Sequence, residues 1–120
     1  MILHRKGDKK FGPNRWEFVS AFVEDNPGLQ EYAQKQVGDE TGLEVKFVRR
    51  GADFTVFDEY GEWLIHPFLF EARSENAVLR PADHTEFKWV SASETNKYET
   101  VKDLEKNLRA LHLGTNNGPN

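Results

Sequence analysis

The spacing of apolar and polar residues predicts strands at the start of the chain, followed by a helix. Residues 16–23 are rich in aromatic and β-branched side chains and follow a loop-forming stretch, so they predict a strand. Residues 1–4 predict a shorter strand. The pair Asn26-Pro27 is typical of a helix start, with asparagine as the N-cap and proline at the first helical position. This helix is expected to run to about Val37.

The middle of the chain returns to the pattern of a sheet. Gly42 is placed to end the helical region, and residues 43–50 mix apolar and charged positions in the manner of a strand. Residues 54–57 and 63–65 flank a polar stretch with Gly61 late in it, which predicts a hairpin.

The last third predicts further strand and one more helix. Pro67 in the second arm of the hairpin favours an edge strand or a bulge, and residues 68–70 are expected to continue that strand. Residues 86–90 alternate charged with aromatic or aliphatic side chains and predict the last strand. Residues 114–120 have no apolar anchor and are expected to fray. An apolar stripe at helical spacing predicts a final helix that packs on the sheet, carrying Val101, Leu104, Leu108 and Leu111.

Composition excludes several kinds of site. The chain has no cysteine, which excludes disulfides, thiolate metal sites and cysteine nucleophiles. The four histidines show no metal-ligand spacing and do not predict a zinc site. No apolar run approaches the roughly 18 residues of a membrane span, and the first residues lack the pattern of a signal peptide. We therefore expect a cytoplasmic protein without a membrane partner.

Charge is distributed unevenly along the sequence. The formal net charge is −4, but residues 1–15 carry five basic side chains against one aspartate, a local +4 that leaves −8 for the remainder. This basic loop either steers a phosphate-bearing ligand toward acidic residues or is simply solvated. In the first case its contact residues would be Lys9, Lys10 and Arg15.

Residues 21–43 follow, without a gap, the spacing G-x5-E-x7-R-E-U-x-E-E-x-G-U, where U is aliphatic. This string resembles the Nudix box, and the resemblance extends to the flanking segments 15–18 and 86–91. The resemblance implies a Nudix-type α/β/α sandwich with a mixed curved sheet, a box helix and a C-terminal helix. We expect a single domain at residues 1–113.

The resemblance also implies a chemistry. In Nudix hydrolases, carboxylates of the box helix hold Mg2+ or Mn2+ against the pyrophosphate of a nucleoside diphosphate derivative. At about 100° per residue, Gln36, Asp39 and Glu40 share one face of the helix if the helix reaches Glu40, and these three are the expected metal ligands. Glu40 is also a candidate catalytic residue. The face expected to pack on the sheet carries Leu29, Ala33 and Val37.

Four positions depart from the family's box: Ala21, Pro27, Lys35 and Gln36. Gln36 keeps a carbonyl oxygen but loses the negative charge, so it binds a cation more weakly and cannot act as a general base. Lys35 keeps a charge that can contact substrate but lacks the planar fork of arginine.

Another acid would have to replace the missing carboxylate. Glu86 matches a position that supplies a ligand or base in some Nudix enzymes, and it is the leading catalytic candidate. The alternative is that Glu86 is a surface or structural acid. Glu24 and Asp25, in the loop before the helix, are alternatives.

Two functions follow from this degenerate box. One is a slow, metal-dependent hydrolase of a nucleoside diphosphate linked to another moiety. The other is a catalytically inactive Nudix-fold module that binds a nucleotide, RNA or protein partner. The first strand also starts later than is usual in the family, which leaves open a shortened sheet edge, a different start, or a homodimer that supplies the missing edge.

Overall fold

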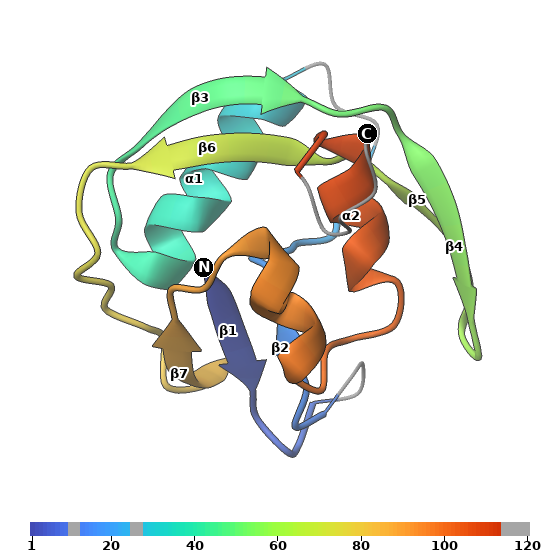
Figure 1. The fold of residues 1–120 in the computed structure, drawn as a ribbon, viewed down its shortest axis with the longest axis horizontal. Helices are drawn as coiled ribbons and strands as arrows, with labels where there is room; N and C mark the ends of the chain where they lie inside the picture. Colours follow the sequence, from blue (N-terminus) through green and yellow to red (C-terminus); the bar gives the residue numbers. More distant parts are fainter. Residues whose placement is uncertain (10–12, 25–27, 114–120) are drawn as a thin grey trace.

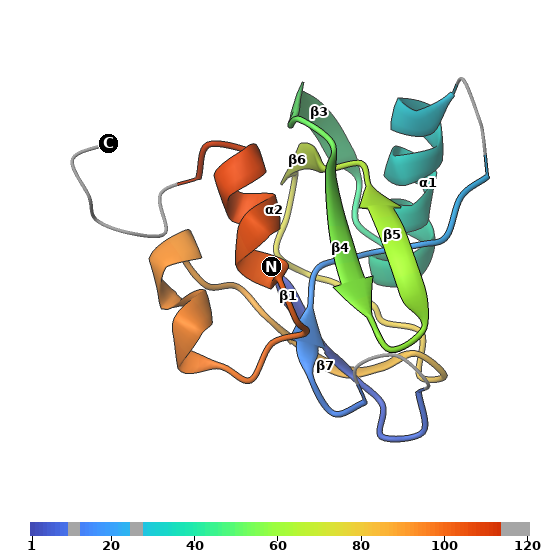
Figure 2. The ribbon, with the colours of Figure 1, turned by 90° about the vertical axis from the view of Figure 1, so that its right-hand side faces the viewer.

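A computed structural model describes residues 1–9, 13–24 and 28–113. Strands lie between two helical layers, with α1 on one side and α2 with a short 3-10 helix, η1, on the other (Figures 1 and 2). The α/β class and the sandwich layering expected from the sequence are confirmed. The elements are β1 (Ile2–Arg5), β2 (Trp16–Glu17), α1 (Leu29–Thr41), β3 (Val45–Arg50), β4 (Phe54–Asp58), β5 (Gly61–Ile65), β6 (Phe68–Ala72), β7 (His84–Lys88), η1 (Ala92–Lys97) and α2 (Leu104–Ala110).

The strands of the described residues form three antiparallel groups. The first has the order β2-β1-β7, so both edges of β1 are paired within the chain. The second pairs β3 with β6, and the third is the β4–β5 hairpin, which projects at the side of the molecule (Figure 1). The hairpin was predicted from its sequence, and its register of Phe54 opposite Ile65 confirms the prediction.

Helix α1 extends one turn beyond its predicted end. It is capped by Gly42, whose φ of 69° is left-handed and whose N–H donates to the Gly38 carbonyl at 2.8 Å. The side chain of Thr41 is fully buried; its hydroxyl donates to the Val37 carbonyl at 2.6 Å and accepts from the Leu43 N–H at 3.2 Å. These bonds hold the last turn in helical form, so the helix includes residue 40. At the other end the N-cap is Gly28, while the predicted cap at residues 26–27 lies outside the described residues.

Two strand predictions were wrong in extent. The strand expected at 16–23 ends at Glu17, because Trp16 exchanges backbone hydrogen bonds with residues 99 and 101 and the chain then leaves the ladder. Residues 68–70 do not continue the hairpin; β6 is a separate strand that pairs with β3. Pro67 separates the two strands, since it has no N–H to donate and its carbonyl accepts from Gly51 N–H at 3.0 Å.

Helix α2 packs closely on the strand layer. A Cβ atom at Gly51 would lie 2.6 Å from the Ala110 carbonyl oxygen, so this approach requires glycine. Arg49 donates from Nε and Nη2 to the Leu111 carbonyl at 2.8 and 2.6 Å. Buried side chains of β1 and of the α2 region contribute to the core. They are Ile2, Leu3, Leu104, Leu108 and Leu111. Within the described part of the chain, no helix has the length and apolar character needed to cross a bilayer.

Candidate functional site

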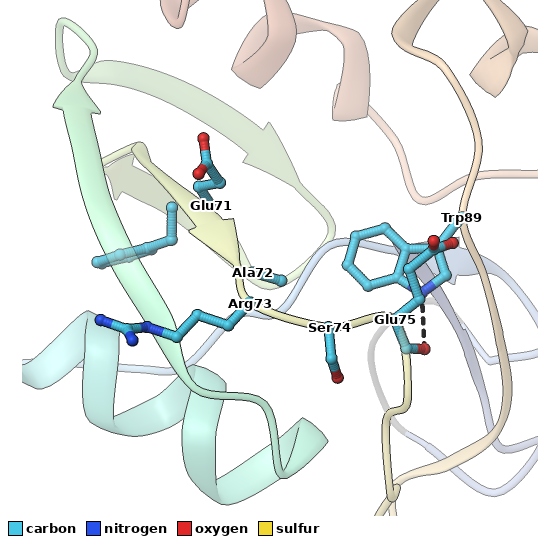
Figure 3. A pocket seen from close by; sticks show the side chains of 7 residues that line it. Glu71, Ala72, Arg73, Ser74, Glu75 and Trp89 are labelled. Atoms are coloured by element: carbon cyan, nitrogen blue, oxygen red, sulfur yellow. Dashed lines mark hydrogen bonds between the residues drawn. The ribbon is translucent and has the colours of Figure 1, made fainter.

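The described residues line two surface hollows that differ in chemistry. The larger, about 420 Å³, is lined by residues 70–75 and Trp89 (Figure 3). The charged side chains of Glu71 and Arg73 diverge there, and Trp89 donates from its indole to the Glu75 carbonyl at 3.0 Å. Charged groups that point apart cannot act together on one ligand, so this hollow is a poor candidate for a catalytic site.

The second hollow, about 260 Å³, gathers titratable groups from distant parts of the chain. The box helix α1 supplies Gln36 and Glu40, one helical turn apart. Strands β1 and β2 and the segments around them supply most of the remainder. The lining residues are Arg5, Lys9, Glu17, Ser20, Ala21, Phe22, Gln36, Glu40, Arg80, Asp83 and His84.

Glu40 is the most perturbed acid of this cavity. The residue is only 7% exposed, and burial raises the pKa of its carboxyl to about 7. The neighbouring charges of Glu17 and Asp83 raise the pKa further, whereas those of His84 and Arg80 oppose them. Near neutral pH this carboxyl is thus divided between its two protonation states in the metal-free protein.

A buried ion cluster forms the floor beside Glu40. Glu17 accepts at Oε2 from Arg5 Nη1 at 2.7 Å and lies 2.8 Å from His84 Nε2; its Oε1 accepts from the Ser20 hydroxyl at 3.1 Å. The side chains of Glu17 and His84 are 7% and 2% exposed. With three donors around it, Glu17 is held in place and is less available than Glu40 to bind a cation.

Two basic side chains, Lys9 and Arg80, line the cavity beside its acids. Lys9 Nζ donates to Asp83 Oδ1 at 2.6 Å, and this hydrogen bond holds the pKa of Asp83 below its usual value. Arg80 reaches Asp39 with a separation of 4.0 Å, and its side chain is half exposed. Arg80 therefore has donors available to a ligand.

The structure brings together some of the sequence-predicted site residues. Glu40, Gln36 and Lys9 line one cavity. Asp39 lies on the helix surface and accepts from Lys35 Nζ at 2.6 Å; this bond holds its pKa below the usual value. Neither Asp39 nor Lys35 lines the cavity.

The remaining predicted residues lie elsewhere. Glu86 is exposed on β7 opposite His4, outside the cavity lining. Arg15 is exposed just before β2, and Glu24 is exposed and does not line the cavity. Lys10 and Asp25 lie outside the described residues.

Sequence reasoning missed the buried cluster of Arg5, Glu17 and His84. A signal existed for Glu17, since the segment 15–18 carries part of the resemblance and a glutamate in a mostly apolar stretch needs a buried partner. His84 carried no such signal. Its partner is 67 positions away in the sequence.

The cavity offers a small set of ligands for a metal ion. Within the described ranges, no three His, Asp or Glu side chains are grouped so as to hold one. Mg2+ takes one or two protein carboxylates and completes its octahedron with water and phosphate oxygens. Glu40 with the amide oxygen of Gln36 fits that minimum, provided that a phosphate-bearing ligand supplies further oxygens.

Replacing Glu40 with glutamine should stabilise the metal-free protein at pH 8 by about 1–3 kcal/mol. Because the folded-state pKa of Glu40 is raised to about 7, its favourable contribution is complete below the unfolded pKa near 4.5 and is lost as pH rises through 7. Glutamine has no such transition. Urea unfolding at pH 4.5 and pH 8 measures this; equal stability of the two proteins at pH 8 would contradict the burial of Glu40.

Comparison with known proteins agrees with this geometry. The family model described as "NUDIX domain" matches residues 1–111, which is nearly the whole chain. A comparison with curated proteins gives no match. The matched region includes the box helix, the cavity and both flanking strands. The chain therefore belongs to the NUDIX domain family, and its function is of the Nudix hydrolase kind.

Proposed function

We propose that the protein is a slow, divalent-metal-dependent hydrolase of a nucleoside diphosphate linked to another moiety. The observation that carries this proposal is the position of Glu40, a buried carboxyl that lines one cavity together with Gln36, Lys9 and Arg80. Lys9 and Arg80 would attract an anionic ligand, and Glu40 and Gln36 would face that ligand from helix α1. Family membership supports a nucleotide derivative as the ligand.

The lining residues would have different roles. Arg80 would neutralise phosphate charge and orient the ligand. Lys9 would contribute less, because it is already paired with Asp83. Glu40 would accept a proton from the attacking water. A divalent cation, held by Glu40, Gln36 and phosphate oxygens, would supply further charge neutralisation and acidify water.

The test is hydrolysis of a panel of nucleoside diphosphate derivatives with Mg2+ or Mn2+. Replacing Glu40 with glutamine should lower kcat at least tenfold, since a positioned general base contributes about 10² or more. The matched control is Glu31→Gln, an exposed acid on the same helix outside the cavity, which should change kcat less than twofold. Turnover that depends on metal but survives in Glu40→Gln would place the reaction elsewhere.

A binding module without catalysis is the second candidate. It is favoured by one observation: Asp39 is engaged by Lys35, so the described part of the box helix presents a single carboxylate to the cavity. Calorimetric titration distinguishes the candidates. Tight, metal-independent binding of the panel compounds with no turnover would support the module.

A further inference from the structure

The aromatic side chains near the site differ in what they can contact. Phe22 lines the same cavity as Gln36 and Glu40, and it is 66% exposed. Phe57 is similarly exposed, at 61%, but lies on the β4–β5 hairpin outside the cavity lining. Tyr32 is half-buried, and its hydroxyl donates to the Phe22 carbonyl at 2.8 Å. Of the aromatic side chains in the described ranges, the Phe22 ring is thus the one that lines the cavity and that an occupant would meet.

Tyr32 and Trp63 support Phe22 in this position. The hydrogen bond from Tyr32 connects its backbone to helix α1, which also carries Gln36 and Glu40. The ring of Trp63, on β5, lies 5.4 Å from the Phe22 ring between centroids, at 46°. Because the Phe22 ring packs against Trp63 and is still largely exposed, it loses little conformational freedom when a planar group stacks on it.

The lining of the cavity combines charged and apolar side chains. Arg80 and Lys9 bring positive charge, while Phe22 brings apolar ring surface, and both kinds of residue line one hollow of about 260 Å³. A ligand with a planar aromatic group joined to a diphosphate matches both. A diphosphate without an aromatic group matches the basic residues alone.

We propose that Phe22 is a specificity-determining residue that stacks on the base of a nucleoside diphosphate and selects it over non-aromatic diphosphates. This inference rests on the proposed function for the placement of the phosphates. Stacking of a base on an aromatic side chain contributes about 1–3 kcal/mol, so losing it should weaken binding roughly tenfold.

The experiment compares two probes, ADP and inorganic pyrophosphate, by calorimetric titration in the presence of Mg2+. Phe22→Leu keeps apolar bulk but removes the ring, and should weaken ADP binding about tenfold while changing pyrophosphate binding less than twofold. Phe22→Tyr should restore ADP affinity. The matched control is Phe57→Leu, which removes an equally exposed ring away from the cavity and should leave both affinities unchanged.

Three results would overturn the inference: unchanged ADP affinity in Phe22→Leu, an equal loss for pyrophosphate, or no ADP binding to the wild-type protein. Because Phe22 is largely exposed, the leucine variant should fold, and circular dichroism checks this. The measurement is of binding rather than turnover. Ring-dependent ADP binding without hydrolysis would therefore sustain the inference while refuting the proposed catalysis.

Discussion

Replacing Gln36 with glutamate should raise the rate of metal-dependent hydrolysis about a hundredfold. The substitution places a second carboxylate one turn from Glu40 in the cavity, where the present side chain offers only an amide oxygen. A second carboxylate strengthens cation binding and leaves one of the two free to accept the proton while the other holds the cation, and a positioned base contributes about 10² or more. The rate is measured as kcat at saturating metal, together with a metal titration at fixed substrate.

The control for this gain is Gln30→Glu. It adds the same charge to the same helix, but Gln30 does not line the cavity, so the rate should stay within twofold of wild type. If Gln36→Glu binds Mg2+ more tightly yet turns over no faster, the missing carboxylate is not what limits the reaction.

Replacing Arg5 with methionine should lower the free energy of unfolding by about 3 kcal/mol. The guanidinium lies 2.7 Å from the Glu17 carboxylate, and the two side chains are 17% and 7% exposed. Its loss removes the cationic partner of a buried carboxylate, and the donors that remain, His84 and Ser20, do not carry a permanent charge. Urea unfolding at pH 7 measures the change.

A double-mutant cycle separates the loss of the pair from the loss of packing. Adding Glu17→Leu to the Arg5→Met protein removes the stranded charge and should recover a large part of the stability. Lys35→Met is the exposed counterpart, because Lys35 is 70% exposed in its ion pair with Asp39, and it should cost less than about 1 kcal/mol. Equal losses in Arg5→Met and Lys35→Met would show that burial of the cluster adds nothing.

Local patterns were sufficient for much of the fold. Gly42 was placed to end the helical region because a left-handed cap is a property of a few neighbouring residues, although the helix was expected to stop one turn earlier, near Val37. The hairpin at residues 54–65 was predictable for the same reason. The extent of β2 was not, since the strand ends where Trp16 bonds to the backbone around residue 100, a partner that local propensity does not reveal.

The candidate site divides in the same way. Helical spacing alone places Gln36 and Glu40 on one face, and the structure finds them in one cavity. The same spacing places Lys35 four positions before Asp39, the separation at which opposite charges on a helix pair, so the engagement of Asp39 was also readable from the sequence and was overlooked. Helical spacing could not predict the role of His84, because His84 meets Glu17 of β2 only when β2 and β7 pair with the two edges of β1.

The cavity wall is assembled from parts of the molecule that belong to different strand groups. Helix α1 packs on β3 and β6, whereas Arg5 and His84 belong to β1 and β7 in another group. A diphosphate held by both sides would act as a removable crosslink between these two halves. Binding of the diphosphate would then couple the local opening of α1 more tightly to that of β1 and β7, including at residues far from the cavity.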